Sequence, residues 1–325
     1  MSSVRIDSEP RAERVRPGAI HGNHFYRTPQ TLVVIHADRW TLLFDSGEGT
    51  AIETRELSGA GAVRIEIEPL CAHAIRNDGS ADLHVLAMNE AEAFPRMLAQ
   101  PVTKIAGVDG CRSGWIAVVK DGASLDTRLC ASDEELLALF SECAVVAIDV
   151  PIGLAERGPR SCDHHARRLL GRRASCVFPA PLRPLLASTD YAEANRVSNR
   201  LQQRGISKQG WAIVPKVAQI DRVLQRRREL RGRVYEVHPE VSFAMWNGGT
   251  PIAASKRSKE GLAARRELAL SHFASIPDPP RGAREDDVLD ALAALWTAER
   301  IAAGRAQSLG DARADLTGLP MRIVY

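Results

Sequence analysis

Short runs of apolar and β-branched residues fill the first part of the chain. The clearest of them cover residues 31–44, 62–69 and 81–88, and the reversals between them carry Gly, Asn, Asp and Ser. Clustered or alternating apolar residues, interrupted by such turn signals, are typical of β-strands joined by tight turns. The pattern therefore predicts an all-β sandwich or barrel for residues 1–95.

The pattern changes at Lys104, where predicted strands begin to alternate with helices. Residues 132–144 have helical spacing, with Ser132 as N-cap and Glu135 completing a capping box. Mixed strands and helices of this kind indicate an α/β domain. The strands predicted around this helix cover residues 104–110, 114–122 and 144–150.

A chain of 325 residues is long enough for two domains that each bury a core. We expect an all-β domain over residues 1–95, a linker at 96–102 and an α/β domain over 103–325. Arginine-rich segments at about 155–232 predict an insertion within the second domain.

Composition places the chain among ordinary soluble proteins, with 45% hydrophobic and 26% charged residues. No run reaches the roughly 18 apolar residues that a membrane span requires, so we expect no membrane contact and a cytoplasmic location. Six cysteines are scattered without a CxxC pair, which favours reduced thiols.

Charge is distributed unevenly between the two predicted domains. The residues before Val102 carry 10 basic and 14 acidic side chains, whereas the remainder carries 33 and 26. The basic excess of the second part is suited to a polyanion such as nucleic acid.

Two aspartates follow buried-looking strands of the second domain. Asp109 comes after Ile105–Val108, and Asp149 comes after Val145–Ile148. Carboxylates at the ends of neighbouring strands would repel one another, and a divalent cation would relieve that repulsion. Oxygen ligands of this kind suit Mg²⁺, although a strand-terminal Asp can also cap a turn.

Further acids stand on a third predicted strand and on the last predicted helix. On an extended strand from 233, Glu236, His238 and Glu240 would share one face. The helix over 285–304 carries Asp287 and Asp290 three positions apart. The helix dipole alone explains acids in the first turn, but it does not explain Asp290 one turn further in.

This order of acids resembles the RNase H-like fold, in which acids on the first strand, the fourth strand and a late helix hold catalytic metals. The second domain more closely resembles an uncharacterised bacterial and archaeal family described as predicted RNase H-like nucleases. The resemblance rests on GVDGCRSGW (107–115), IDVPIGL (148–154), RSCDHHARRLLGRRASCVFPAP (160–181), GISKQ (205–209), YEVHPEVSF (235–243) and DDVLDALAALWTA (286–298).

The resemblance implies a nuclease that cleaves phosphodiester bonds with one or two Mg²⁺ or Mn²⁺ ions. Asp109, Asp149, Asp287 and Asp290 would bind the metal, and Glu236 would be a nearby ligand or orienting group. One departure is Gln219, where the family pattern leads us to expect an acid.

Residues 21–26 (HGNHFY) and 69–77 (PLCAHAIRN) resemble the two motifs of the cupin superfamily. The resemblance implies a small barrel, with His24 and His73 at two of the metal-ligand positions. Three departures argue against the usual metal site, so we assign no metal to this half and expect a regulatory or vestigial cupin that binds a small molecule or holds a homodimer. The departures are Tyr26 for the second His, Gln30 near the expected Glu and Cys71 for a turn glycine, while His21 and His36 remain possible substitutes.

The predicted insertion is rich in arginine, whose guanidinium groups suit phosphate without reading sequence. Nucleic acid is therefore the expected partner, although a solvated helix face would have the same composition. The arginines concerned are Arg157, Arg160, Arg167, Arg168, Arg172, Arg173, Arg183, Arg222, Arg226, Arg227, Arg228 and Arg231.

Two other functions stay open at this stage. Sugar kinases and actin-like ATPases also begin with a strand and a GxDxG-like turn, but no glycine-rich phosphate loop follows residues 148–154 here. A non-catalytic, ligand-sensing protein is the other alternative, and the departures at Tyr26 and Gln219 favour it.

Overall fold

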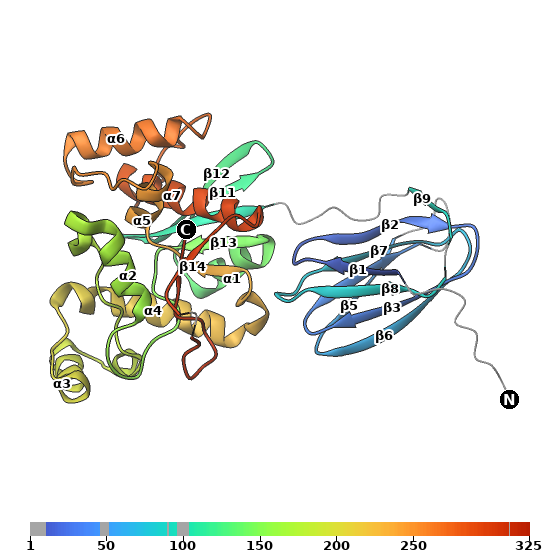
Figure 1. Cartoon of the computed structure of the whole chain (residues 1–325), viewed down its shortest axis with the longest axis horizontal. Helices are drawn as coiled ribbons and strands as arrows, with labels where there is room; N and C mark the ends of the chain where they lie inside the picture. Colours follow the sequence, from blue (N-terminus) through green and yellow to red (C-terminus); the bar gives the residue numbers. More distant parts are fainter. Residues whose placement is uncertain (1–10, 46–51, 90, 96–103, 312) are drawn as a thin grey trace. The chain divides into compact units, whose positions relative to one another are not determined.

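A computed structural model describes residues 11–45, 52–89, 91–95, 104–311 and 313–325. The chain divides into two compact units, Met1–Thr103 and Lys104–Tyr325, which are coloured by sequence in Figure 1. The linker predicted at 96–102 lies outside the described residues. None of the helices in these ranges is both long and apolar enough to cross a membrane.

The N-terminal unit is all-β, as the alternating pattern predicted, and it consists of two antiparallel sheets. Buried side chains such as Leu32, Val34, Trp40 and Ile75 form its core. One sheet has the order β1 (Arg11–Val15), β8 (Leu83–Ala87), β3 (Gln30–His36), β6 (Gly61–Ile67). The other has the order β5 (Glu53–Leu57), β4 (Trp40–Phe44), β7 (Ala72–Asn77), β2 (Ile20–Tyr26), β9 (Ala93–Pro95).

The C-terminal unit is α/β and is built on one mixed five-stranded sheet. The sheet has the order β12 (Ser124–Cys130), β11 (Gly114–Asp121), β10 (Ile105–Cys111), β13 (Val145–Ile148), β14 (Val234–Glu236). Strands β10, β11 and β12 pair antiparallel, whereas β13 pairs in parallel with β10, and β14 in parallel with β13.

Helices cover both faces of this sheet. On one face α1 (Asp133–Glu142) and α4 (Lys208–Arg226) pack on alternate residues of the strands, Val108 among them. On the other face lies α7 (Glu285–Ala302), which packs closely against β10. The capping box predicted at Ser132 and Glu135 begins α1, as expected.

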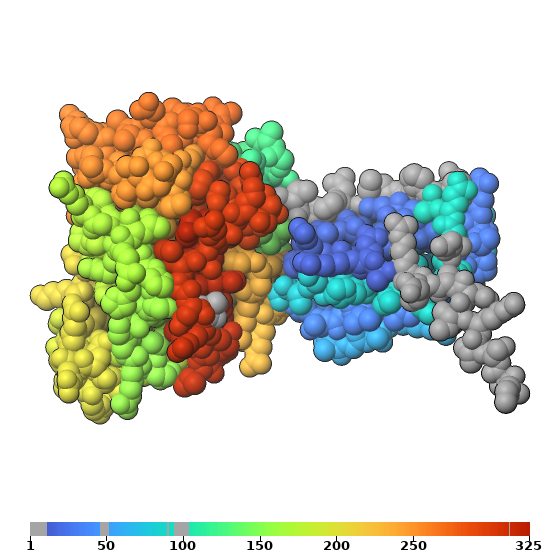
Figure 2. Space-filling model, in the orientation of Figure 1, coloured from blue at the N-terminus to red at the C-terminus, as the bar shows by residue number. Residues whose placement is uncertain are grey.

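The remaining elements of this unit surround the sheet. Figure 2 shows the surface of α2 beside the C-terminal segment, and α2 contacts both short strands of that segment. The helical elements are α2 (Ser161–Leu170), η1 (Gly171–Cys176), η2 (Arg183–Ala187), α3 (Tyr191–Gln202), η3 (Arg228–Leu230), α5 (Pro239–Trp246) and α6 (Lys259–Leu270). The two short strands are β15 (Ser308–Leu309) and β16 (Ile323–Val324).

Candidate functional site

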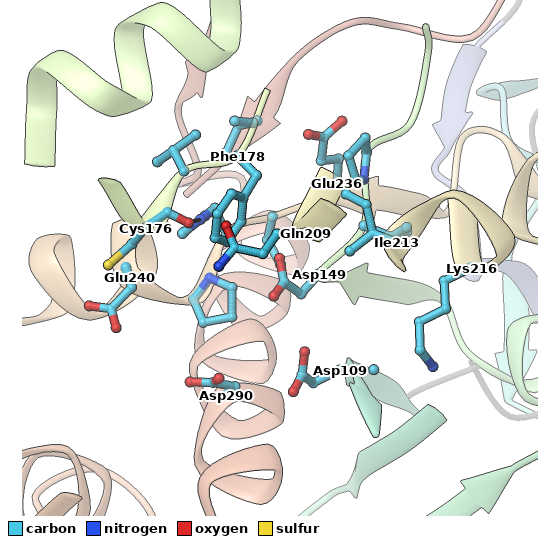
Figure 3. A pocket seen from close by; sticks show the side chains of 18 of the residues that line it. Asp109, Asp149, Cys176, Phe178, Gln209, Ile213, Lys216, Glu236, Glu240 and Asp290 are labelled. Carbon is cyan, nitrogen blue, oxygen red and sulfur yellow. Dashed lines mark hydrogen bonds between the residues drawn. The ribbon is translucent and has the colours of Figure 1, made fainter. Parts of the chain in front are cut away.

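A cavity of about 590 Å³ opens where β10, β13 and β14 end. Parallel pairing of β10 with β13 places Val108 opposite Ile148, so Asp109 and Asp149 follow at the same edge of the sheet. The first turns of α7 add Asp287 and Asp290 to the lining. Figure 3 shows Asp109, Asp149 and Asp290 reaching into one space from different elements.

Asp109 and Asp149 interact directly. Asp109 is only 6% exposed, and the carboxyl group of Asp149 lies close enough to affect its charge. Burial and the negative charges of Asp290 and Asp149 raise the pKa of Asp109 well above its usual value. Asp109 therefore keeps its proton to a higher pH than an isolated aspartate would.

Asp290 lies one turn into α7 and is buried at 2% exposure. Burial raises its pKa to about 6, although the ammonium group of Lys256 forms an ion pair with it and opposes the shift. Burial disfavours the charged form of Lys256, but the carboxylates of Asp290 and Asp109 outweigh it and raise the pKa of that lysine. Lys256 is therefore a counter-ion of the acidic cluster.

Asp287 has a structural role at the N-terminus of α7. Its Oδ2 accepts a hydrogen bond of 2.9 Å from the backbone N–H of Arg284, which forms half of a capping box. The helix-terminus explanation therefore holds for this residue. Its carboxylate still lines the cavity, so a second role toward a ligand remains open to it.

Three hydrogen bonds fix the carboxylate of Glu236. The guanidinium group of Arg160 donates to both of its oxygens at 2.6 and 2.7 Å, and the backbone N–H of Ile152 donates at 2.6 Å. Arg160 also contacts Asp163, and all three charged side chains are almost fully buried. This arrangement favours the orienting role of Glu236 over a role as metal ligand.

The expectation that Glu236, His238 and Glu240 share one strand face is wrong. Strand β14 ends at Glu236, and α5 begins at Pro239 because proline suits the first turn of a helix. Glu240 therefore lies in a helix, where Arg265 donates to both of its oxygens at 2.7 and 2.8 Å. All three residues nevertheless line the cavity.

Gln219 does not line the cavity. Its Oε1 accepts from Trp115 Nε1 at 2.9 Å, and its Nε2 donates to Asp133 at 3.0 Å. It therefore links β11 to α1 through hydrogen bonds, and its replacement of an acid leaves the cluster around Asp109 intact. Lys216, one turn earlier on α4, does line the cavity, and burial lowers its pKa.

Several arginines of the predicted insertion are occupied within the fold. Arg160 is buried against Glu236, and Arg183 pairs with Asp221 and Asp315. They are unavailable to a nucleic acid because their guanidinium groups already neutralise internal carboxylates. The exposed members of the set are Arg157, Arg168, Arg172, Arg222, Arg226 and Arg228.

Sequence reasoning missed the ion pairs of Lys256 and Arg160. These residues come from loops or helix ends without a periodic pattern, so no local signal identified their carboxylate partners. In the N-terminal unit, sequence reasoning named three histidines but assigned them no metal: among the described residues, one set of three metal-ligating side chains has ligand atoms within 4.8 Å of one another, namely His21, His24 and His73. Among the described residues, no three acidic side chains of the C-terminal unit bring their oxygens as close together as these histidines bring their nitrogens.

The family model described as "Protein of unknown function (DUF429)" matches residues 107–315, which is more than half of the chain. The chain belongs to this family. The DUF429 match includes Asp109, Asp149, Asp290 and Lys256, whereas the three histidines lie outside it. No curated protein matches the chain.

Solved structures similar to this DUF429 chain match only a part of it. The capsular polysaccharide assembling protein CapF from Staphylococcus aureus is 17% identical, with 27% of this chain and 26% of that chain covered at a TM-score of 0.24. The sugar 3,4-ketoisomerase QdtA from Thermoanaerobacterium thermosaccharolyticum is 15% identical, with 25% and 61% covered at a TM-score of 0.21. The chain thus spans less than two thirds of either protein.

Proposed function

We propose that the C-terminal unit is a hydrolase of phosphodiester bonds that uses Mg²⁺ or Mn²⁺ held by Asp109, Asp149 and Asp290. The observation that carries the proposal is the convergence of these three acids in one cavity. They come from the first strand of the sheet, the end of its fourth strand and the last long helix, which is the order expected from the resemblance to RNase H-like nucleases.

The electrostatics of the cluster support a cation as ligand. Burial, together with the mutual repulsion of Asp109, Asp149 and Asp290, raises the proton affinity of the group, and Lys256 supplies only one positive charge. Buried acids of this kind cost stability unless a cation neutralises them. Carboxylate oxygens are the ligands that Mg²⁺ and Mn²⁺ prefer, so the donor set fits these ions.

The remaining lining supports a phosphate-containing substrate. Lys216 and Arg257 place positive charge around the same cavity, and exposed arginines of the insertion would extend that charge to a longer nucleic acid. A bound divalent ion would activate a water and stabilise the departing oxygen. Glu236 would orient Arg160 through their hydrogen bonds. Asp109 would keep its proton until the cation binds.

The test is a cleavage assay of the full chain on single-stranded and duplex DNA and RNA with Mg²⁺ or Mn²⁺. We expect Asp109→Asn and Asp290→Asn to lower the rate by about 100-fold or more, because each removes charge from the ion site. Asp286→Asn is the matched control, since this neighbouring acid of α7 is absent from the cavity lining. Cleavage that persists in EDTA, or equal rates in Asp109→Asn and wild type, would reject the proposal.

A metal-free binding site for an anionic ligand is the second candidate. The ion pair between Lys256 and Asp290 favours it, because the cluster already holds a cation. Lys256→Met distinguishes the two functions in a calorimetric titration with Mn²⁺. The variant should bind Mn²⁺ at least as tightly as wild type if the acids form a metal site, whereas no Mn²⁺ binding by either protein would favour the metal-free candidate.

For the N-terminal unit we propose a cupin-like barrel with a regulatory or vestigial role. Support comes from the two motifs at 21–26 and 69–77, which form the adjacent strands β2 and β7 with His24 directly opposite His73. Pairing of two copies through this unit and a cytoplasmic location stay predictions.

A further inference from the structure

Three histidines converge in the N-terminal unit, whereas the acids of the proposed hydrolase belong to the C-terminal unit. His21 and His24 lie on β2, and His73 lies on β7. The ring centroids of His24 and His73 are 4.7 Å apart, and that of His21 is 5.9 and 6.2 Å from theirs. One ligand nitrogen from each side chain lies within 4.8 Å of the others, so small ring rotations would let all three reach one ion.

A β-bulge explains why all three rings share one face of the sheet. Residues three apart on a regular strand point to opposite faces, which would separate His21 from His24. The pairing of β2 with β7 shifts between Gly22 and His24, and Asn23 has a φ of 61°. The extra residue reverses the alternation and returns His21 to the side of His24.

Gly22 is required for this bulge. Its φ is +98°, and a Cβ atom at this position would lie 2.7 Å from the backbone oxygen of His73. A side chain here would therefore strain the backbone and push β7 away. The sequence Gly22-Asn23 is the local signal of the bulge.

The ring nitrogens of the cluster are buried without partners. Within the described ranges, His21 Nε2, His24 Nε2 and both nitrogens of His73 have no hydrogen-bond partner, and His73 is only 1% exposed. A buried polar atom without a partner costs about 1–3 kcal/mol, so such atoms call for an explanation.

An acidic side chain orients the outermost ring. The carboxylate of Glu13 on β1 lies 3.0 Å from His21 Nδ1, while Nε2 of that ring is buried without a hydrogen-bond partner. A carboxylate that accepts the Nδ1 proton fixes the tautomer in which Nε2 can bind a metal. This pairing is the usual support of a metal-bound histidine.

We propose that His21, His24 and His73 bind a divalent transition metal, with Zn²⁺ as the reference ion, through a three-nitrogen set that leaves a coordination position open. Imidazole nitrogens suit Zn²⁺, Co²⁺, Ni²⁺ and Cu²⁺, whereas Mg²⁺ prefers oxygen. Three protein ligands are typical of zinc sites that also hold a water or small anion. The set includes His21 and no carboxylate, so it differs from the cupin pattern that Tyr26 and Gln30 interrupt.

The test is metal binding by the full chain, without any activity assay. Metal-free protein is titrated with Zn²⁺ by calorimetry and with Co²⁺ by visible absorption, in the presence of excess Mg²⁺ to occupy oxygen sites. We expect one equivalent to bind. The Co²⁺ complex should show intense d–d bands, which indicate a low coordination number with nitrogen ligands. His24→Gln and His73→Gln should weaken binding at least 100-fold, and Glu13→Gln should weaken it by about 10- to 100-fold.

Controls separate this site from the acidic cluster and from loss of folding. His84→Gln changes an exposed histidine of the same unit, and Asp109→Asn changes the cluster; both should bind Zn²⁺ like wild type. If His73→Gln fails to fold by circular dichroism, His21→Gln replaces it, because this ring lies nearer the surface. Absence of binding in wild type, or wild-type affinity in folded His24→Gln and His21→Gln, would overturn the proposal.

Discussion

The carboxyl group of Asp290 is subject to two opposing effects, its burial and its ion pair with Lys256. Burial raises its pKa to about 6 even though Lys256 pairs with it. Desolvation therefore outweighs the attraction of one lysine, and neighbouring carboxylates add to the effect. A buried carboxylate of this kind is stabilised either by a proton or by a divalent cation.

The pH dependence of stability follows from Asp290. Its pKa is higher in the folded protein than in the unfolded chain, so between pH 4 and 6 the folded state binds more protons. The free energy of unfolding should then fall as the pH rises through this window. In urea titrations without divalent metal, wild type should lose up to about 3 kcal/mol relative to Asp290→Asn between pH 4 and 7.

The comparison with Asp290→Asn removes the contributions of groups that do not interact with Asp290, so the difference reports on Asp290 together with its partners Asp109 and Lys256. Excess Mn²⁺ should reduce the loss in wild type, because the ion replaces the proton in the cluster. Parallel stability curves for the two proteins from pH 4 to 7 would show that Asp290 has an ordinary pKa.

At the scale of elements, the packing of α7 on β10 sets the distance between Asp109 and Asp290. Gly107 makes this packing possible, since a Cβ atom there would lie 2.0 Å from the backbone oxygen of Ala291. Backbone atoms of a long helix cannot yield at one point without moving the whole helix. A side chain at residue 107 would therefore separate the first-strand acid from the helix acid.

We expect Gly107→Ala to destabilise the protein by about 3 kcal/mol or more, at or beyond the upper end of ordinary overpacking. Chemical denaturation measures the loss, and a weaker response of stability to Mn²⁺ should accompany it. Gly61→Ala is a matched control, because its added Cβ would meet only ordinary contacts with His36 at 3.7 Å. Equal stability of the two variants would show that α7 does not approach β10 this closely.

Local patterns predicted the elements better than their partners. The helix expected at 285–304 is observed as Glu285–Ala302, because its apolar spacing reports directly on the buried face. The strand β12 (Ser124–Cys130) was missed, since its polar residues give no clear alternation. Pro239 could have indicated the start of α5, but the acids and His on either side suggested an extended strand instead.

The whole molecule joins two units whose cores are separate. Parallel pairing could be inferred from two similar strands, so the meeting of Asp109 and Asp149 was predictable. The loop that brings Lys256 to Asp290 depends on long-range packing that no local pattern reports. The bulge that brings His21 beside His24 has a local signal in Gly22-Asn23, but the sequence does not show which residues it places together. The sequence therefore identified the acidic cluster and left the histidine set without an assigned metal.

Two cores and two different donor sets predict two metal-specific responses to heating. One core contains Trp40 and Ile75, and another contains Trp115 and Phe140. Since a ligand stabilises only the folded unit that binds it, Zn²⁺ should raise one calorimetric transition and Mn²⁺ the other. At 100 times its dissociation constant, either ion should contribute about 2.7 kcal/mol to its own unit.

Variants assign the two transitions. His24→Gln should abolish the response to Zn²⁺ and leave the response to Mn²⁺ intact, whereas Asp290→Asn should do the reverse. Selective loss in both directions requires that nitrogen and oxygen ligands in different units bind different ions. If each variant weakened both responses equally, the two ions would share one site, and the assignment of separate metal chemistry to the two units would fail.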